Sequence, residues 1–121
     1  MKDAWELHHY YEDLERKVKS SYYSKYYLTM FGVVNEFIFL LSKFVALINK
    51  ENLKGWFSSV KKCSSMKKTI KEFLPLTELI LNSRTPEIMF DSCEKLWKNC
   101  NEFAKNEQIE IKKVNILQEI I

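Results

Sequence analysis

The chain has 121 residues, of which 46% are hydrophobic and 29% charged, and its 19 Lys and Arg against 16 Asp and Glu give a net charge of +3. This length fits one domain, and the composition excludes the low-hydrophobicity signature of disordered chains. Two glycines and two prolines are too few for a turn-rich β-sandwich, a β-barrel or a dinucleotide-binding fold. We therefore expect residues 1–121 to form a single all-α domain, a compact bundle of four to five mainly antiparallel helices.

The first helix is expected to begin near Asp3, with Glu6 in the capping-box position three residues later. Its apolar residues recur at steps of three and four and form one stripe, namely Trp5, Leu7, Tyr11, Leu14 and Val18. The pair Ser20-Ser21 is the expected break, although no glycine or proline enforces it there.

A second helix is expected from about Tyr22 to Asn49, and its hydrophobicity places it at the centre of the core. The expected core positions are Phe31, Val34, Phe37, Ile38, Leu41, Phe44, Val45 and Ile48. A close helix crossing would account for Gly32, which costs roughly 1 kcal/mol relative to Ala inside a helix. The helix is long enough to span a membrane, but its polar residues recur every seven positions along one face. These polar residues, which favour a helix buried in a bundle, are Asn35, Glu36, Ser42, Lys43, Asn49 and Lys50.

The region from Glu51 to Ser83 contains several signals that interrupt helices. A third helix is expected from Glu51, with Leu53, Trp56, Phe57, Val60 and Cys63 facing the core. Ser64-Ser65 offers a break, after which the helical period of Met66, Ile70, Phe73 and Leu74 continues to Pro75. Pro75 lacks a backbone donor and must kink or restart the helix, which Asn82 with Ser83 then ends.

Thr85-Pro86-Glu87 is the clearest helix start in the chain, with a capping residue, a proline at the first helical position and an acid in the first turn. The apolar seam that follows suits antiparallel packing and consists of Met89, Cys93, Leu96, Cys100 and Phe103. From Glu107 the pattern is mixed, since Ile109 and Ile111 alternate as in a strand, and the helical surroundings favour a helix. The apolar side chains near Ile121 predict burial against a second subunit or a partner.

The residues needed for catalysis or metal binding do not form a recognisable pattern. The two histidines, His8 and His9, are adjacent, so a di-iron bundle, a zincin-type site and a nucleophile triad all lack a second histidine-bearing element. We expect no enzyme activity, no catalytic residues, no metal and no cofactor. Three cysteines, Cys63, Cys93 and Cys100, without a secretory leader favour reduced core thiols and a cytoplasmic location.

All six tyrosines lie between positions 10 and 27 and are interleaved with basic residues. The two pairs Tyr22-Tyr23 and Tyr26-Tyr27 would form a ribbon two side chains wide on a continuous helix. Tyrosines between cations stack nucleic-acid bases, and tyrosine is equally a residue of protein interfaces. Ordinary packing, with half of these rings in the core, is the third alternative.

A run of lysines follows beside Trp56 and Phe57, and residues 50–71 carry a net charge of +6. Lys54, Lys61 and Lys68 are seven residues apart and would form a column on one helix, if that helix continued through Ser64-Ser65. With Lys62 and Lys67, such a column suits phosphates, an anionic membrane surface or an acidic protein. A merely solvated face is the common alternative.

These observations predict a small non-enzymatic protein-interaction module, a regulator or inhibitor that binds a macromolecular partner through the four tyrosines and five lysines. The alternative is a nucleic-acid-binding bundle that uses the same residues. A homo-oligomer is a further alternative, and a membrane partner is disfavoured. Lys, Ile, Asn, Phe, Tyr and Met outnumber Gly, Ala, Arg and Pro by 53 residues to nine, which indicates an AT-rich genome. A phage, a virus or a mobile element is therefore a candidate source, with the host cytoplasm as the location.

Overall fold

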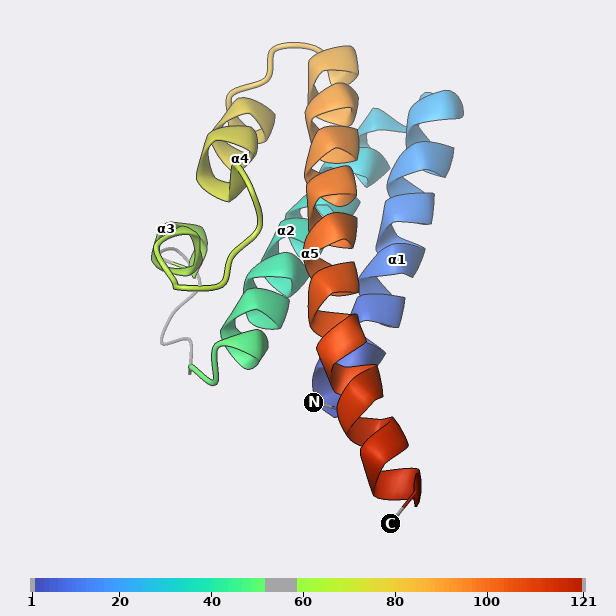
Figure 1. Cartoon of the computed structure of the whole chain (residues 1–121). Helices are drawn as coiled ribbons and strands as arrows, with labels where there is room; N and C mark the ends of the chain where they lie inside the picture. The colour runs from blue at the N-terminus through green and yellow to red at the C-terminus, as the bar shows by residue number, and fades with distance from the viewer. Residues whose placement is uncertain (1, 52–58, 121) are drawn as a thin grey trace.

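The computed structural model contains five helices in the part of the chain that it describes, and no strand there (Figure 1). It describes the backbone of residues 2–51 and 59–120, and the side chains of residues 12–51 and 60–107. The helices are α1 (Lys2–Tyr23), α2 (Tyr27–Ile48), α3 (Ser59–Ser64), α4 (Phe73–Leu81) and α5 (Pro86–Ile120). The predicted all-α bundle is confirmed.

The three long helices form the body of the bundle, and α3 with α4 lies along one side (Figure 1). The most extensive contact joins α1 to α2, which run antiparallel, and the next joins α4 to α5. Because the α3–α4 segment carries the chain back to the end where α2 began, α5 starts near the first turn of α2 and runs in the same general direction (Figure 1).

The second helix is the centre of the core, as its sequence predicts. The residues that α2 buries are apolar except Ser42: Met30, Val34, Phe37, Ile38, Leu40, Leu41, Ser42, Phe44, Val45, Ala46 and Ile48. By length and composition α2 could cross a membrane, but 56% of its most apolar window is buried inside the bundle.

Gly32 and Ser42 of α2 do not have the surroundings that the sequence predicts. The predicted close crossing at Gly32 is absent, because a Cβ placed there would meet nothing within 4 Å. Ser42, placed on a polar face by its spacing, is fully buried, and its hydroxyl donates to the Ile38 carbonyl at 3.2 Å. Its own carbonyl accepts the Cys63 thiol at 3.2 Å, so this polar residue is paired within the core.

The break after α1 lies at residues 24–26 and not at Ser20-Ser21. The backbone N–H of Tyr26 donates to the Ser21 carbonyl at 2.9 Å, and that of Lys25 donates to the Tyr22 carbonyl at 3.1 Å. This pair of bonds is a Schellman motif, in which Lys25, at φ 62°, occupies the left-handed position that glycine usually fills. A lysine gives no sequence signal for such a stop, so the sequence pattern does not locate this break.

The end of α2 repeats the same motif. Glu51 N–H donates to the Ala46 carbonyl at 2.9 Å, Lys50 N–H donates to the Leu47 carbonyl at 3.1 Å, and Lys50 has φ 57°. A left-handed backbone costs an L-residue other than glycine about 1 kcal/mol or more. Both ends of the α1–α2 hairpin therefore contain a strained lysine.

The prediction of a helix from Met66 to Leu74 is wrong, although α3 does end at Ser64 as expected. Residues 65–72 form a non-helical connection whose Ile70 side chain enters the core. Pro75 is the third residue of α4 and so lies in the first turn, where the backbone N–H has no partner within the helix. The proline is therefore accommodated at the start of a helix and does not kink one. The third helix expected from Glu51 falls largely on residues 52–58, which lie outside the described part.

Three further predictions, on the end of α4 and on both ends of α5, are confirmed, whereas the Asp3 cap falls on side chains outside the described part. Asn82 follows the last residue of α4, and α5 begins at Pro86. The Thr85 hydroxyl accepts the Ile88 backbone N–H at 3.2 Å, which is the predicted N-cap bond. The tail beyond Glu107 is helical to Ile120, so the helical alternative for this segment is the correct one.

The strained lysines predict stabilising substitutions. We expect Lys25→Gly and Lys50→Gly each to raise the free energy of unfolding by about 0.5 to 1 kcal/mol, because glycine adopts positive φ without strain. Chemical denaturation measures the change. Lys17→Gly, on the exposed face of α1, is the matched control and should instead destabilise by about 1 kcal/mol. Destabilisation by all three substitutions would contradict the assigned helix ends.

Candidate functional site

The helix break at residues 24–26 splits the predicted tyrosine ribbon into two pairs at one corner of the bundle. Tyr22 and Tyr23 end α1, and Tyr26 and Tyr27 lie at the start of α2. Tyr22 is half-buried and stacks on Phe90 of α5, with ring centroids 4.1 Å apart and planes within 2°. Tyr23 meets Phe90 edge-on at 5.6 Å, and Tyr27 lies 6.5 Å from Tyr22. Tyr22 therefore packs against α5 at this corner, while Tyr23 and Tyr27 lie on the surface.

The exposed side chains at this corner are large and apolar. Tyr23 is 68% exposed, Tyr26 67% and Leu28 89%. Phe31, one turn along α2, is 48% exposed, so its predicted place in the core is wrong. We call Tyr23, Tyr26, Tyr27, Leu28 and Phe31 the aromatic corner. Leu28 was not predicted as a surface residue, because helical spacing alone does not tell which apolar positions a neighbouring helix covers.

A shallow groove continues the aromatic corner toward the α4–α5 turn. It has a volume of about 180 Å³, and Tyr27, Met30 and Phe31 of α2 form one wall. The opposite wall is formed by Ser83, Arg84, Thr85, Pro86 and Met89. The groove is thus lined by apolar side chains together with Arg84, and only the tertiary structure brings its two walls together.

The predicted lysine column does not form. Lys61 and Lys62 lie in the last turn of α3, which ends at Ser64, and Lys67 and Lys68 lie in the connection that follows. All four are exposed. Lys54 lies outside the described residues. The condition on which the column depended, one helix continuing through Ser64-Ser65, is not met.

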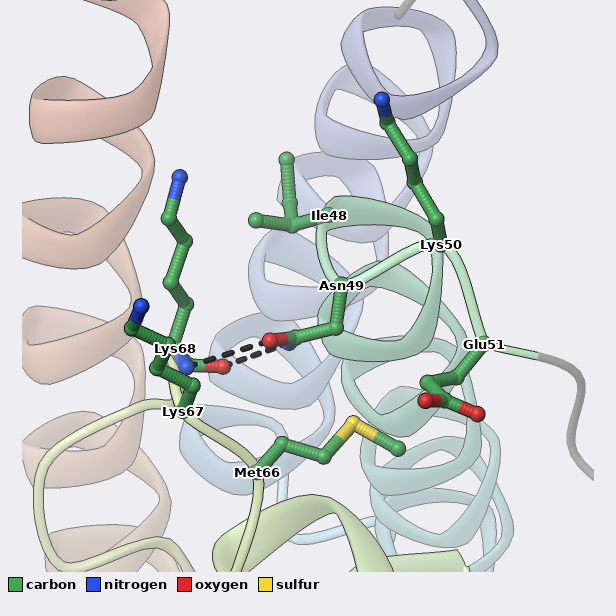
Figure 2. Close-up of a pocket in the computed structure, with 7 residues that line it drawn as sticks. All are labelled: Ile48, Asn49, Lys50, Glu51, Met66, Lys67 and Lys68. Atoms are coloured by element: carbon green, nitrogen blue, oxygen red, sulfur yellow. Dashed lines mark hydrogen bonds between the residues drawn. The ribbon is translucent and has the colours of Figure 1, made fainter.

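The side chain of Asn49 clamps this connection onto the end of α2 (Figure 2). Its amide donates to the Lys68 carbonyl at 2.6 Å, and its oxygen accepts the Lys68 backbone N–H at 3.1 Å. The same amide also donates to the Val45 carbonyl at 2.7 Å. Across the bundle, the Asn99 amide donates to the Lys71 carbonyl at 2.9 Å, so two asparagines hold the connection between α3 and α4.

A cavity of about 350 Å³ lies beside the clamp and is lined by Ile48, Asn49, Lys50, Glu51, Met66, Lys67 and Lys68. The Lys50 and Lys68 side chains extend from the clamp on either side of Ile48 (Figure 2). The Lys68 amine lies 3.5 Å from the Glu107 carboxylate, and Glu51 adds a second negative charge to the lining. The amines are therefore not gathered around one point, as a phosphate cradle requires.

The clamp predicts that Asn49, the residue after α2, contributes more to stability than Asn35 within α2. We expect Asn49→Ala to lower the free energy of unfolding by about 1 to 3 kcal/mol, because backbone groups of the connection lose their partners. Thermal or urea unfolding measures this. Asn35→Ala is the matched control, since the Asn35 amide bonds only the Phe31 carbonyl of its own helix, and should cost less. Equal losses in the two variants would contradict the clamp.

The tyrosines and lysines do not form one surface. The aromatic corner surrounds the first residue of α2, Tyr27, and the clamp surrounds its last, Ile48. These two residues are 21 helical steps apart, which is about 32 Å at a rise of 1.5 Å per residue. A partner of modest size that contacts one group therefore leaves the other free.

A pair of carboxyl groups, which the sequence analysis did not single out, lies in the contact between α1 and α5. Glu15 is only 7% exposed, and a side-chain hydrogen bond joins it to Glu94. Burial, together with this hydrogen bond and the charge of Glu94, raises the pKa of Glu15 to about 7. The sequence signal is weak, since Glu15 is one acid among five in the first fifteen residues and simply follows the apolar Leu14.

The three cysteines are buried thiols that form no disulfide, as predicted. Burial raises the pKa of Cys63 to about 11, and it raises the pKa of Cys93 further, assisted by the nearby Glu94 and Glu15. Thiolates are the reactive form, so burial makes these cysteines poor nucleophiles. Among the described side chains, no three His, Cys, Asp or Glu residues are grouped to hold a metal ion, and the side chains of His8 and His9 lie outside that part.

Thiol reactivity tests this arrangement. We expect a disulfide reagent at pH 8 to modify the folded protein about 100-fold or more slowly than the denatured protein, in which all three thiols should react. The measurement is the release of the chromophore with and without denaturant. Rapid stoichiometric modification of a thiol in native buffer would contradict the burial of Cys63, Cys93 and Cys100.

Comparison with known proteins gives no guide to this surface. No protein-family model, no curated protein and no solved structure matches the chain. Any function must therefore be inferred from the chemistry of the aromatic corner, of the exposed Lys61, Lys62, Lys67 and Lys68, and of the Glu15–Glu94 pair.

Proposed function

We propose that the chain is a non-enzymatic protein-interaction module that acts as a regulator or inhibitor by binding a protein partner through the aromatic corner. The observation that carries the proposal is the exposure of Tyr23, Tyr26 and Leu28, each more than two-thirds in solvent, beside the half-exposed Phe31. Exposed apolar side chains that are contiguous mark interaction sites on soluble proteins. Tyrosine is enriched at the centres of such sites, because it provides a large contact area with little loss of side-chain entropy.

The corner is also held in shape before any partner binds. Tyr22 is stacked on Phe90, and the Schellman motif at Lys25 fixes the path of the chain between α1 and α2. A surface that is already ordered pays little conformational entropy on binding. The groove next to Phe31 supplies a place for an apolar side chain of the partner, and Arg84 at its edge suits a carboxylate.

Charge substitutions in the corner test the proposal. We expect Leu28→Asp combined with Phe31→Asp to weaken partner binding at least about tenfold, because a carboxylate would be desolvated in the interface, while the unfolding temperature changes little. The protein would carry a photoreactive residue in place of Tyr26, and the measurement is the yield of its crosslinked protein adduct in the source cell.

The control is Leu47→Asp, which makes the same change on α2 at a side chain 38% exposed, about 28 Å from Leu28 along the helix. A photoreactive residue in place of the exposed Lys98 of α5 is the second control. The proposal predicts one adduct from position 26 that survives Leu47→Asp and is lost in the double variant. Equal adducts from both positions, or an adduct insensitive to the double variant, would contradict it.

The alternative function, binding of nucleic acid, depends on the lysines. Lys61, Lys62, Lys67 and Lys68 are exposed within eight residues of one another, so a phosphate backbone remains a suitable ligand for this region. Replacing these four lysines with Glu should abolish nucleic-acid retention and its salt dependence, and it should leave crosslinking from the aromatic corner unchanged. Absence of any shift of DNA or RNA at low salt removes this alternative.

A further inference from the structure

The carboxyl pair lies on the same seam as the aromatic corner. Tyr22 follows Glu15 by seven residues on α1, which is two helical turns and about 10.5 Å. Phe90 precedes Glu94 by four residues on α5, which is one turn. The stacked rings and the paired carboxyls are therefore two successive contacts between the same two helices.

We propose that the Glu15–Glu94 pair is a proton-operated latch that holds α1 against α5 while the two carboxyls share a proton, and that loosens this seam when the proton is lost. Two carboxyl groups in hydrogen-bonding contact favour the state with one proton between them, because two negative charges this close repel and Glu15 is buried away from water. The pair thus binds the helices together in its protonated form and pushes them apart in its ionised form.

The surroundings of the pair supply little compensation for a second negative charge. The charged or titratable groups that act on Glu15 are Glu94 of α5, and Lys19 and Arg16 of its own helix. The Arg16 side chain is 70% exposed and already lies 3.4 Å from Glu12 and 3.6 Å from Asp13. The Cys93 thiol is buried beside the pair and stays neutral. From α2, which packs against both helices, every buried side chain is apolar except Ser42.

One oxygen of the pair has no other partner to stabilise its charge. Glu94 Oε1 is buried and has no hydrogen-bond partner within the described residues. An unpaired buried carboxylate oxygen is costly, so ionisation is most easily relieved by opening the seam and admitting water. The contact between α1 and α5 is also less extensive than that between α1 and α2, so it is the weaker of the two that hold α1.

The direction of the pH dependence follows from the two states of Glu15. Below about pH 4.5 its carboxyl is protonated whether the seam is closed or open, so pH has no effect on opening. Between about 4.5 and the pKa of about 7 in the closed seam, only the open state releases the proton, so opening grows by up to tenfold per pH unit. Above about 7 both states are ionised and the effect levels off. Between pH 5 and pH 8 the opening equilibrium therefore increases about 70-fold.

Amide hydrogen exchange measures this opening on the intact chain. We expect amides of residues 12–23 and 86–97 to lose about 70-fold in protection between pH 5 and pH 8, after correction for the intrinsic rate, while amides at the centre of α2 change much less. Glu15→Gln and Glu94→Gln should each flatten the dependence, because neither leaves two carboxyls to ionise. Glu102→Gln removes one charge from the exposed face of α5 and should leave the dependence intact.

Two variants keep the test decisive if one of them folds poorly, and no partner needs to be known. Flat dependence in either Glu15→Gln or Glu94→Gln, beside a preserved dependence in Glu102→Gln, supports the latch. Protection that is independent of pH in the unmodified protein overturns it, as does a dependence that persists in both Gln variants. An equal loss of protection in all helices also overturns it, because that result describes global unfolding and not a seam.

Discussion

The burial of α2 is the constraint on which the rest of this structure depends. By length and apolar composition α2 could cross a membrane, yet eleven of its 22 residues are buried by the surrounding helices. Burial of each large side chain among them stabilises the folded state by about 1.5 to 3 kcal/mol. A fold that left this helix exposed to water would therefore be much less stable. The other elements are positioned by the need to cover it, with α1 on one side and the α3–α4 segment and α5 on the others.

The coverage is incomplete at the first turns of α2, and this gap produces the aromatic corner. Because α1 ends at Tyr23 with a left-handed Lys25, the chain reverses with two tyrosines on each side of the turn. Leu28 and Phe31 then face outward at the end of the bundle, beyond the reach of the helices that shield Phe37 and Leu41. This exposed apolar surface at the end of the central helix is the feature that most clearly indicates a binding site for a partner.

Polar side chains decide details that apolar packing leaves open. Asn49 pairs with both backbone groups of Lys68, which helps a segment with helical spacing to keep a non-helical path. Ser42 and Cys63 pair across α2 and α3 in the core. Glu15 and Glu94 bring a shared proton into a seam between helices, so that the contact between α1 and α5 depends on pH, whereas the side chains that α2 buries are apolar except Ser42.

The sequence by itself determined the helical class, the central place of residues 34–48 and the start of the last helix. These features follow from short-range rules: the 3.6-residue period of apolar side chains, and the Thr85-Pro86 cap, whose bond is local. Where helices stop was decided by tertiary structure, since Lys25 and Lys50 adopt positive φ without a residue type that announces it. The tertiary structure likewise divided the tyrosines from the lysines, exposed Phe31 and paired Glu15 with Glu94. Such contacts join residues as many as 79 positions apart, and a periodic pattern carries no information about which neighbour covers a given position.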